Sequence, residues 1–175
     1  MAILVVGSIG YDSVQTPFGR CDGILGGSAT YFAVAASYLA PVSIISVVGQ
    51  DFSAEDQDLL DIHQINTDGL TRADGETFRW IGEYGDDLNH ANTIGTHLNV
   101  FADFKPELDD RASQEAYLFL ANIDPDLQLQ VLGQMKRRPR LVVGDTMNFW
   151  IEGKKRALFD VIRALDTLII NRGEA

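Results

Sequence analysis

The chain has 175 residues, a length typical of a single domain with a substantial buried core. Its formal net charge is −11, with 25 acidic against 14 basic residues, which disfavours binding to a nucleic-acid backbone. No apolar run approaches the roughly 20 residues of a membrane-spanning helix, and the N-terminal sequence lacks the basic region of a signal peptide, so we expect no membrane partner and a cytoplasmic location.

Continuous apolar runs recur along the chain, with helical segments between them. The runs span residues 2–7, 42–49, 116–123, 141–145 and 167–171. Such runs are typical of strands that are buried on both faces. Pro41 ends the first helical segment, Ser53 can cap the second, and Asp124 followed by Pro125 can start another. The alternation predicts an α/β fold with a mostly parallel sheet and helices on both faces, in which ligands bind at the carboxyl ends of the strands.

Two stretches interrupt this alternation, residues 11–25 and about 76–104. Both are polar and aromatic with partial period-two alternation, which predicts short antiparallel strands that together could form a lid. Phe78, Trp80 and Tyr84 could contact a substrate there, although alternating aromatic residues in a strand more often serve packing. Because no linker or internal repeat divides the chain, we expect one domain over residues 1–175.

Gly26 and Gly27 precede a helix that begins near Ser28. Adjacent glycines allow a close approach of the backbone to a ligand, and the free amides at a helix start favour hydroxyl or anionic groups. A plain tight turn explains the pair equally well. A nicotinamide-dependent oxidoreductase is disfavoured, because Ile9 stands where the spacing G-x-G-x-x-G requires a second glycine after Gly7.

Three motifs occur in an order that resembles the ribokinase-like, or PfkB, carbohydrate kinase family. They are GSIGYD (7–12), GGSATYFAVAASYLAPVSIISVVGQDF (26–52) and LIINRGEA (168–175). The resemblance covers the whole chain and implies a ribokinase-like fold with a small β lid. It also implies transfer of the γ-phosphate of ATP to a hydroxymethyl group of a sugar or nucleoside, with Mg²⁺ as the cofactor.

The resemblance also implies roles for individual residues. Asp12 would bind substrate hydroxyl groups, and Gly26 with Gly27 would form the hinge of the lid. Asn122 lies near a position from which the family contacts its substrate. Asn171 and Glu174 match the motif that helps to place magnesium and phosphate, although such a pair can also form a polar turn at a strand end.

The sequence departs from the family pattern at two places near the expected site. Tyr31 stands where many members have Asn, which could alter the substrate pocket. The family often has an aspartate and an asparagine two residues apart after a central strand, whereas Asp145 and Asn148 are three apart. Asp145 could face the substrate or could cap the segment that follows it.

A third departure concerns the catalytic base. In the family, this aspartate lies in a glycine-alanine-glycine-aspartate turn downstream of the N-x-x-E motif, and residues 1–175 contain no such turn. We therefore expect the base and the nucleotide site to lie beyond Ala175, and the chain alone to be an inactive, substrate-binding portion of a kinase. The alternative is a non-catalytic module that binds a sugar or dimerises through the lid, and a homodimer through the lid is also possible for the kinase.

Overall fold

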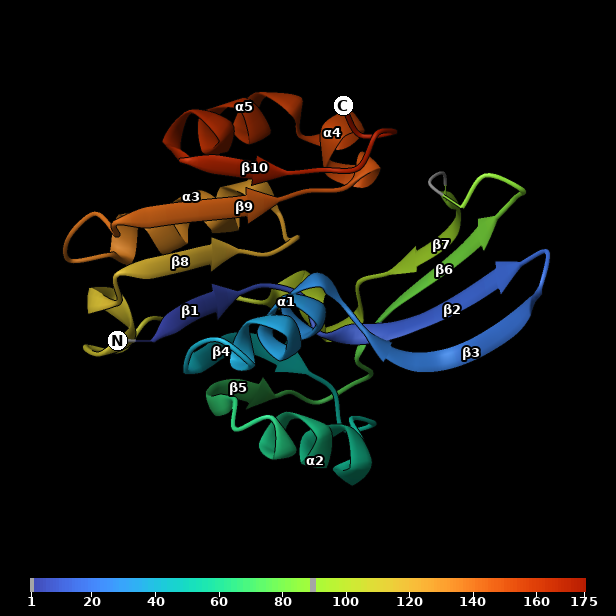
Figure 1. Ribbon diagram of the computed structural model, residues 1–175, viewed down its shortest axis with the longest axis horizontal. Coiled ribbons are helices and arrows are strands. Elements are labelled where there is room, and N and C mark those ends of the chain that lie inside the picture. Colours follow the sequence, from blue (N-terminus) through green and yellow to red (C-terminus); the bar gives the residue numbers. More distant parts are fainter. Residues whose placement is uncertain (1, 89–90) are drawn as a thin grey trace.

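The computed structural model describes residues 2–88 and 91–175 and contains two sheets (Figure 1). Sheet A has the strand order β10-β9-β8-β1-β4-β5, and the lid has the order β3-β2-β6-β7. The strands of sheet A are β1 (Ile3–Val6), β4 (Val42–Val48), β5 (Asn66–Arg72), β8 (Tyr117–Leu120), β9 (Leu141–Asp145) and β10 (Thr167–Ile169). The strands of the lid are β2 (Gly10–Thr16), β3 (Gly19–Gly26), β6 (Phe78–Tyr84) and β7 (Ala91–His97).

All pairings between neighbouring strands of sheet A are parallel, as the sequence predicts. The apolar runs correspond to five of its strands. The edge strand β5 was not predicted, because its sequence NTDGLTR is polar and only partly buried. A continuous apolar run is expected only where both faces of a strand are buried, and no residue of β5 is fully buried.

Helices cover both faces of sheet A. They are α1 (Ser28–Ser37), α2 (Ala54–Ile62), α3 (Pro125–Gln134), α4 (Asn148–Gly153) and α5 (Lys155–Ala164), with 3₁₀ turns at Asn99–Asp103 and Ala112–Gln114. One buried cluster lies under α1, and a second lies under α3 and the first 3₁₀ turn. Both predicted caps are confirmed: Ser53 accepts a hydrogen bond from the Asp56 amide and Asp124 accepts one from the Asp126 amide, each at 3.0 Å.

Helix α1 lies close to sheet A because one of its faces carries small side chains. Ala29, Ala33 and Ala36 are buried against the sheet. The same helix contributes Phe32, which stacks on Phe119 of β8 with ring centroids 3.7 Å apart and nearly parallel planes. This packing brings the start of α1 to the carboxyl end of the sheet.

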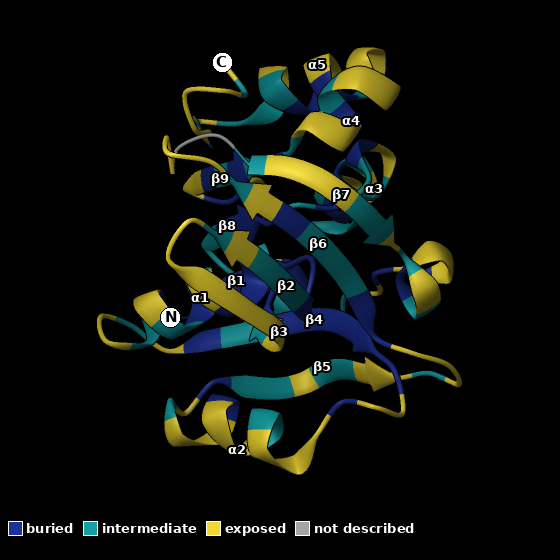
Figure 2. Cartoon of the chain, turned by 90° about the vertical axis from the view of Figure 1, so that its right-hand side faces the viewer, coloured by how far each residue is buried: buried dark blue, intermediate teal, exposed yellow. Residues whose placement is uncertain are grey.

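The two stretches predicted to form a lid contain all four strands of the second sheet. The pairs β2–β3 and β6–β7 are antiparallel, but the central pair β2–β6 is parallel, unlike the prediction. The reason is that β2 follows β1 and β6 follows β5, and both leave the carboxyl edge of a parallel sheet in the same direction (Figure 1). Figure 2 shows that the outer strand β3 is largely exposed. Residues 89–90 of the second stretch lie outside the described residues.

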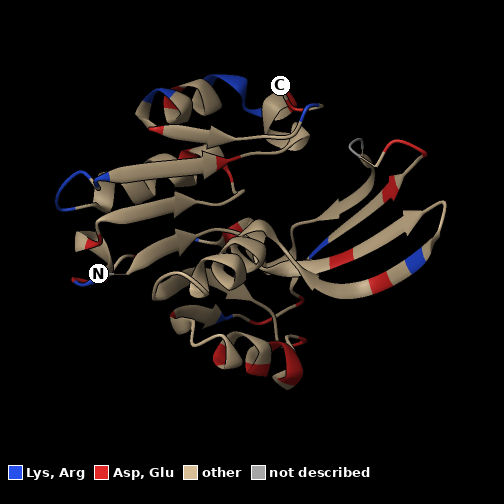
Figure 3. Cartoon of the chain, in the orientation of Figure 1, with Lys and Arg blue, Asp and Glu red and all other residues tan. Residues whose placement is uncertain are grey.

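Basic and acidic side chains are unevenly distributed over the surface (Figure 3). The basic segment 136–140 forms a loop between α3 and β9, while acidic residues gather on α2 (Figure 3). Lys136 pairs with Asp110 at 2.7 Å and Arg138 pairs with Asp166 at 2.8 Å, so two of these cations already have carboxylate partners. In the described part of the chain, no helix combines the length and apolar character needed to cross a bilayer.

Candidate substrate site

A cavity of about 550 Å³ lies between the lid and the carboxyl ends of the strands of sheet A. Ser8 follows β1, Asn122 follows β8, Asp145 ends β9, and Asn171 and Glu174 follow β10. These four strands are neighbours in the sheet. The cavity therefore lies where parallel α/β sheets generally bind their ligands.

Asp12 lines this cavity from β2, and Gly26 makes room for its carboxylate. A Cβ atom at Gly26 would overlap the Asp12 carboxylate. Gly27 has a φ of 90°, and a Cβ atom there would overlap the carbonyl oxygen of Ser8. The glycine pair thus does more than turn the chain. Without Cβ atoms, Gly26 can lie against the Asp12 carboxylate and Gly27 can lie against the backbone of Ser8.

Burial is the main electrostatic influence on Asp12. It raises the pKa of this carboxyl from 3.8 to about 6, although a hydrogen bond from the Gly27 amide opposes the rise. At neutral pH, Asp12 is therefore mostly an ionised carboxylate in a partly desolvated place. Such a group accepts hydrogen bonds from hydroxyl groups strongly.

Three shielded polar atoms around the cavity lack a hydrogen-bond partner among the described residues. They are Asn122 Oδ1, Asp145 Oδ1 and Thr146 Oγ1. All three residues line the cavity. Buried polar atoms in proteins are nearly always paired, so these three atoms are available for hydrogen bonds to a ligand or to water in the cavity.

Asp145 faces the cavity and does not cap the following helix. The residue that precedes α4 is Met147, and no side chain caps that helix. Burial raises the pKa of Asp145 to about 8, the charge of Glu174 adds to the rise, and a hydrogen bond from Ser28 opposes it. Of the two interpretations that the sequence left open, capping of α4 is therefore wrong, and a role of Asp145 in binding substrate stays a prediction.

Gln128 fixes the strand ends that carry these groups. This buried side chain of α3 donates through Nε2 to the carbonyl oxygens of Leu120, Ala121 and Asp145, at 3.1–3.2 Å. The carbonyl groups belong to the ends of the adjacent strands β8 and β9. Gln128 therefore helps to hold Asn122 and Asp145 at a fixed separation.

Asn171 and Glu174 form a reciprocal turn after β10. Asn171 Oδ1 accepts hydrogen bonds from the amides of Gly173 and Glu174, at 2.8 and 3.0 Å. Glu174 Oε2 accepts one from the Asn171 amide at 3.0 Å. The Asn171 oxygen is thus engaged within the turn, while Glu174 Oε1 has no such contact among the described residues.

Sequence reasoning missed several residues that line the cavity. Ser8, Ser28, Thr93 and Thr146 were not predicted as site residues. Ser8 follows β1 closely and Thr146 directly follows β9, so a systematic search of strand ends could have found both. Thr93 could not have been found in this way, because it reaches the cavity only through the pairing of β6 with β7. Each predicted site residue lines the cavity except Gly26, which lies directly against Asp12.

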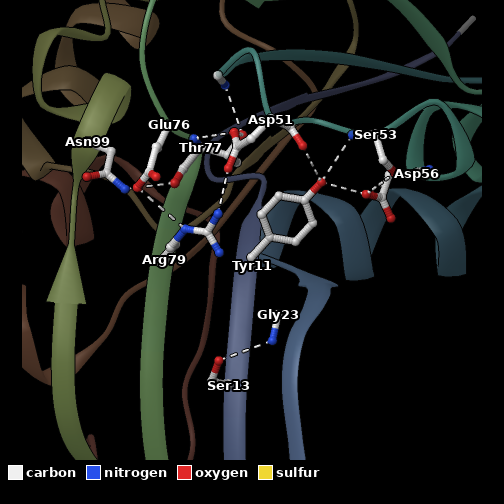
Figure 4. A network of polar contacts seen from close by, with 11 residues as sticks. Tyr11, Ser13, Gly23, Asp51, Ser53, Asp56, Glu76, Thr77, Arg79 and Asn99 are labelled. Carbon is white, nitrogen blue, oxygen red and sulfur yellow. Dashed lines mark hydrogen bonds and ion pairs between the residues drawn. The ribbon is translucent and has the colours of Figure 1, made fainter.

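A network of polar contacts fixes the root of the lid (Figure 4). Asp51, in the turn after β4, accepts hydrogen bonds from the amide and hydroxyl of Thr77 at 2.7 and 2.6 Å. It also forms an ion pair with Arg79 of β6 at 2.6 Å. Burial alone would raise the pKa of Asp51, but the hydrogen bonds from Thr77 and the charge of Arg79 lower it overall.

The same network reaches β2 through Tyr11. Its hydroxyl group donates to Asp56 at 2.6 Å and accepts a hydrogen bond from the Ser53 amide at 3.2 Å. The Arg79 guanidinium lies over the Tyr11 ring, 5.3 Å from its centroid (Figure 4). Both central strands of the lid are therefore anchored to the turn between β4 and α2.

The parallel sheet A, the helices on both of its faces and the β lid beside the carboxyl ends of its strands define the ribokinase-like α/β fold. No family model and no curated protein sequence matches this chain. Solved structures match it at low sequence identity, and they show the fold.

Three of these structures illustrate the likeness. A ribokinase from Cryptococcus neoformans var. grubii in complex with ADP has a TM-score of 0.77 at 20% identity, over 99% of this chain and 59% of its own. A nucleoside kinase from Methanocaldococcus jannaschii, an archaeal member of the ribokinase family, has a TM-score of 0.71 at 20% identity, over 99% and 61%. A fructokinase from Xylella fastidiosa with bound ATP has a TM-score of 0.71 at 16% identity, over 95% and 60%. The chain thus spans about three fifths of the length of these structures.

Proposed function

We propose that this chain is the substrate-binding portion of an ATP-dependent kinase that phosphorylates a hydroxymethyl group of a sugar or nucleoside. The observation that carries the proposal is the set of unpartnered atoms of Asn122, Asp145 and Thr146 around one cavity that Asp12 also lines. Carboxylate and amide oxygens are acceptors suited to hydroxyl groups. The likeness to a ribokinase and a fructokinase solved with ADP and ATP supports phosphoryl transfer for the whole protein.

In this proposal, each side chain has a defined task. Asp12 and Asn122 accept hydrogen bonds from substrate hydroxyl groups and orient the sugar. Gly26 and Gly27 allow Asp12 to approach the start of α1. The lid limits the access of water to the cavity, which strengthens these polar contacts. Positioning of this kind, together with electrostatic stabilisation, accounts for almost all of the catalysis in phosphoryl transfer.

Two carboxyl groups that line the cavity, those of Asp145 and Glu174, are suited to bind Mg²⁺. Glu174 and Asp145 are close enough for the charge of one to raise the pKa of the other, and each has an oxygen without a partner among the described residues. Mg²⁺ usually binds through one or two carboxylates and keeps several waters. Bound there, it would neutralise charge on the phosphates of ATP. Glu174 and Asp145 fit this role, whereas Asn171 shapes the turn that holds Glu174.

Calorimetric titration of the chain with D-ribose, D-fructose and adenosine tests the proposal. We expect at least one of these compounds to bind, and Asp12→Ala to weaken that binding about 10-fold or more, as is typical of a hydrogen bond to a charged group. Asp22→Ala is the matched control, because Asp22 lies on the exposed strand β3 and pairs with Arg20 of the same strand. Failure of all three compounds to bind, or an unchanged affinity in Asp12→Ala, would contradict the proposal.

The same preparation tests magnesium binding and catalysis. Mg²⁺ should raise the melting temperature of the chain, and Glu174→Gln should reduce this rise, whereas Glu152→Gln on the exposed side of α4 should not. Inactivity of the chain alone remains a prediction. A phosphorylated product in a mixture of the chain, ATP, Mg²⁺ and the bound compound would contradict it.

A further inference from the structure

The wall of the cavity on the lid side is aromatic. Phe78, Trp80 and Tyr84 occupy alternate positions of β6 and line the cavity. Tyr31 lines it from α1. The residue Tyr31 is 59% exposed, so packing of the protein core does not explain its presence there.

The indole ring of Trp80 is held in place by its neighbours. Its Nε1 atom donates a hydrogen bond to Thr93 Oγ1 of β7 at 3.3 Å. A Cβ atom at Gly82 would overlap the six-membered part of the ring, so the ring covers a position of β6 that has no side chain. Tyr84 contacts it edge-on, with ring centroids 6.5 Å apart. A pre-oriented aromatic surface of this kind loses little conformational entropy when a ligand binds.

This aromatic surface lies near the carboxylate proposed to hold the sugar. Strand pairing places Asp12 opposite Trp80. Burial raises the pKa values of Tyr31 and Tyr84, and the charge of Asp12 adds to the rise at both hydroxyl groups. Both tyrosines line the same cavity as Asp12, although they come from different elements. One small ligand can contact the carboxylate and the aromatic rings together.

The charges around the cavity limit the ligand further. Asp12 and Glu174 line it, Asp145 is mostly protonated near neutral pH because its pKa is raised to about 8, and no lysine or arginine lines the cavity among the described residues. A phosphate or carboxylate group on the ligand would meet negative charge without a cation to pair with it. Such unpaired burial of charge is strongly unfavourable. The geometry and the charges together favour a ligand that is uncharged.

We infer that the acceptor is an uncharged nucleoside, whose ribose hydroxyl groups bind Asp12 and Asn122 and whose base packs against Trp80, Tyr31 and Tyr84. The inference rests on the proposed function and names its substrate class. A free sugar would use the polar groups but would leave most of the aromatic wall without a partner. A heteroaromatic base has a planar face that suits such a wall.

Calorimetric titration with adenosine, uridine, D-ribose and D-ribose 5-phosphate tests the inference. Adenosine or uridine should bind at least about 10-fold more tightly than D-ribose, the order of gain expected from stacking of a base on an aromatic side chain. D-ribose 5-phosphate should bind more weakly than D-ribose. Equal affinities for the nucleosides and D-ribose, or tighter binding of the phosphorylated sugar, would overturn the inference and leave the proposed function intact. Failure of all four compounds to bind would overturn the inference, and failure of D-fructose as well would overturn the proposed function.

Two variants connect the preference to the aromatic wall. Trp80→Leu and Tyr31→Ala should each reduce the preference for nucleosides, while the affinity for D-ribose should stay within about two-fold. Phe18→Leu is the control, because this lid aromatic is 86% exposed and lies outside the cavity. Since Tyr31 is largely exposed, Tyr31→Ala should fold even if Trp80→Leu does not. A preference that survives Tyr31→Ala and a folded Trp80→Leu would overturn the assignment of the wall.

Discussion

Gly26 and Asp12 lie against each other across the first two strands of the lid, so that a side chain on Gly26 would occupy the space of the Asp12 carboxylate. Gly26→Ala should therefore displace Asp12 and weaken binding of D-ribose or adenosine about 10-fold or more, because a hydrogen bond to a charged group is lost. The fold should persist, since a side chain rather than the backbone has to move.

Gly133→Ala is the control for this substitution, because a Cβ atom at that position of α3 meets no other atom within 4 Å. It should leave binding unchanged and should stabilise the helix slightly. Calorimetric titration of both variants with D-ribose or adenosine measures this difference in affinity. Normal binding by Gly26→Ala would mean that Asp12 does not need its observed position.

The raised pKa of Asp12 predicts that substrate binding depends on pH. Because the ionised carboxylate accepts hydroxyl groups best, affinity should increase as the pH rises through about 6, the pKa of this residue. Asp12→Asn should bind more weakly and should lose this dependence. Titrations at several pH values between 5 and 7.5 measure it. A wild-type affinity that does not change over this range would contradict the role of Asp12.

The same pKa predicts an opposite effect on stability in the absence of ligand. Since folding raises the pKa of Asp12 from 3.8 to about 6, its contribution to stability is fully present below pH 3.8 and is lost as the pH rises through 6. Asp12→Asn should therefore be more stable than the wild type at pH 7.5, and the difference should disappear toward pH 4. Urea unfolding at both pH values measures this difference. The reverse order of stabilities would show that burial does not control the titration.

Thr77 should contribute to stability through the network at the root of the lid. Its hydroxyl group donates to Asp51 at 2.6 Å and accepts a hydrogen bond from the buried Gly49 amide at 2.9 Å. Thr77→Val keeps the shape of the side chain but leaves that amide without a partner, so the free energy of unfolding should fall by about 1–3 kcal/mol. Thr16→Val, in an exposed turn of the lid, should change it by no more than about 0.5 kcal/mol. Similar effects of the two substitutions would argue against a structural role for the network.

Gln128 should affect both stability and substrate binding. Gln128→Leu would leave three carbonyl groups at the ends of β8 and β9 without their donor. We expect the unfolding free energy to fall by about 1–3 kcal/mol, and the affinity for substrate to fall because Asn122 and Asp145 are held less firmly. Gln130→Leu, on the exposed side of the same helix, is the control. A variant that is destabilised but binds normally would limit Gln128 to a structural role.

Much of the fold could be predicted from the sequence, because a strand that is buried on both faces appears as a continuous apolar run. Five strands of sheet A coincide with apolar runs, and the caps at Ser53 and Asp124 mark two helix starts. Strand β5 left no such signal, since its burial is partial and its side chains are polar. The parallel pairing of β2 with β6 was also missed, because local alternation does not record how distant strands pair.

The candidate site could be predicted only in part. Asp12, Asn122, Asp145 and Glu174 follow or extend strands of a parallel sheet, where ligands are expected, and the motifs pointed to the same residues. Whether Asp145 faced the cavity or capped α4 depended on the turn at Met147, which the sequence left open. The indole orientation of Trp80 depends on Gly82 and on Thr93 from the neighbouring strand, and no local pattern reveals such a contact.

The pairing of β2 with β6 also has a consequence for the order in which the molecule folds. These two strands form the middle of the lid, yet they are separated in the chain by β3, α1, β4, α2 and β5. Closing so long a loop is entropically costly unless the intervening elements are already in place. We therefore expect β2 to pair with β6 only after the intervening elements have folded. The binding cavity, which both strands line, would then be completed late in folding.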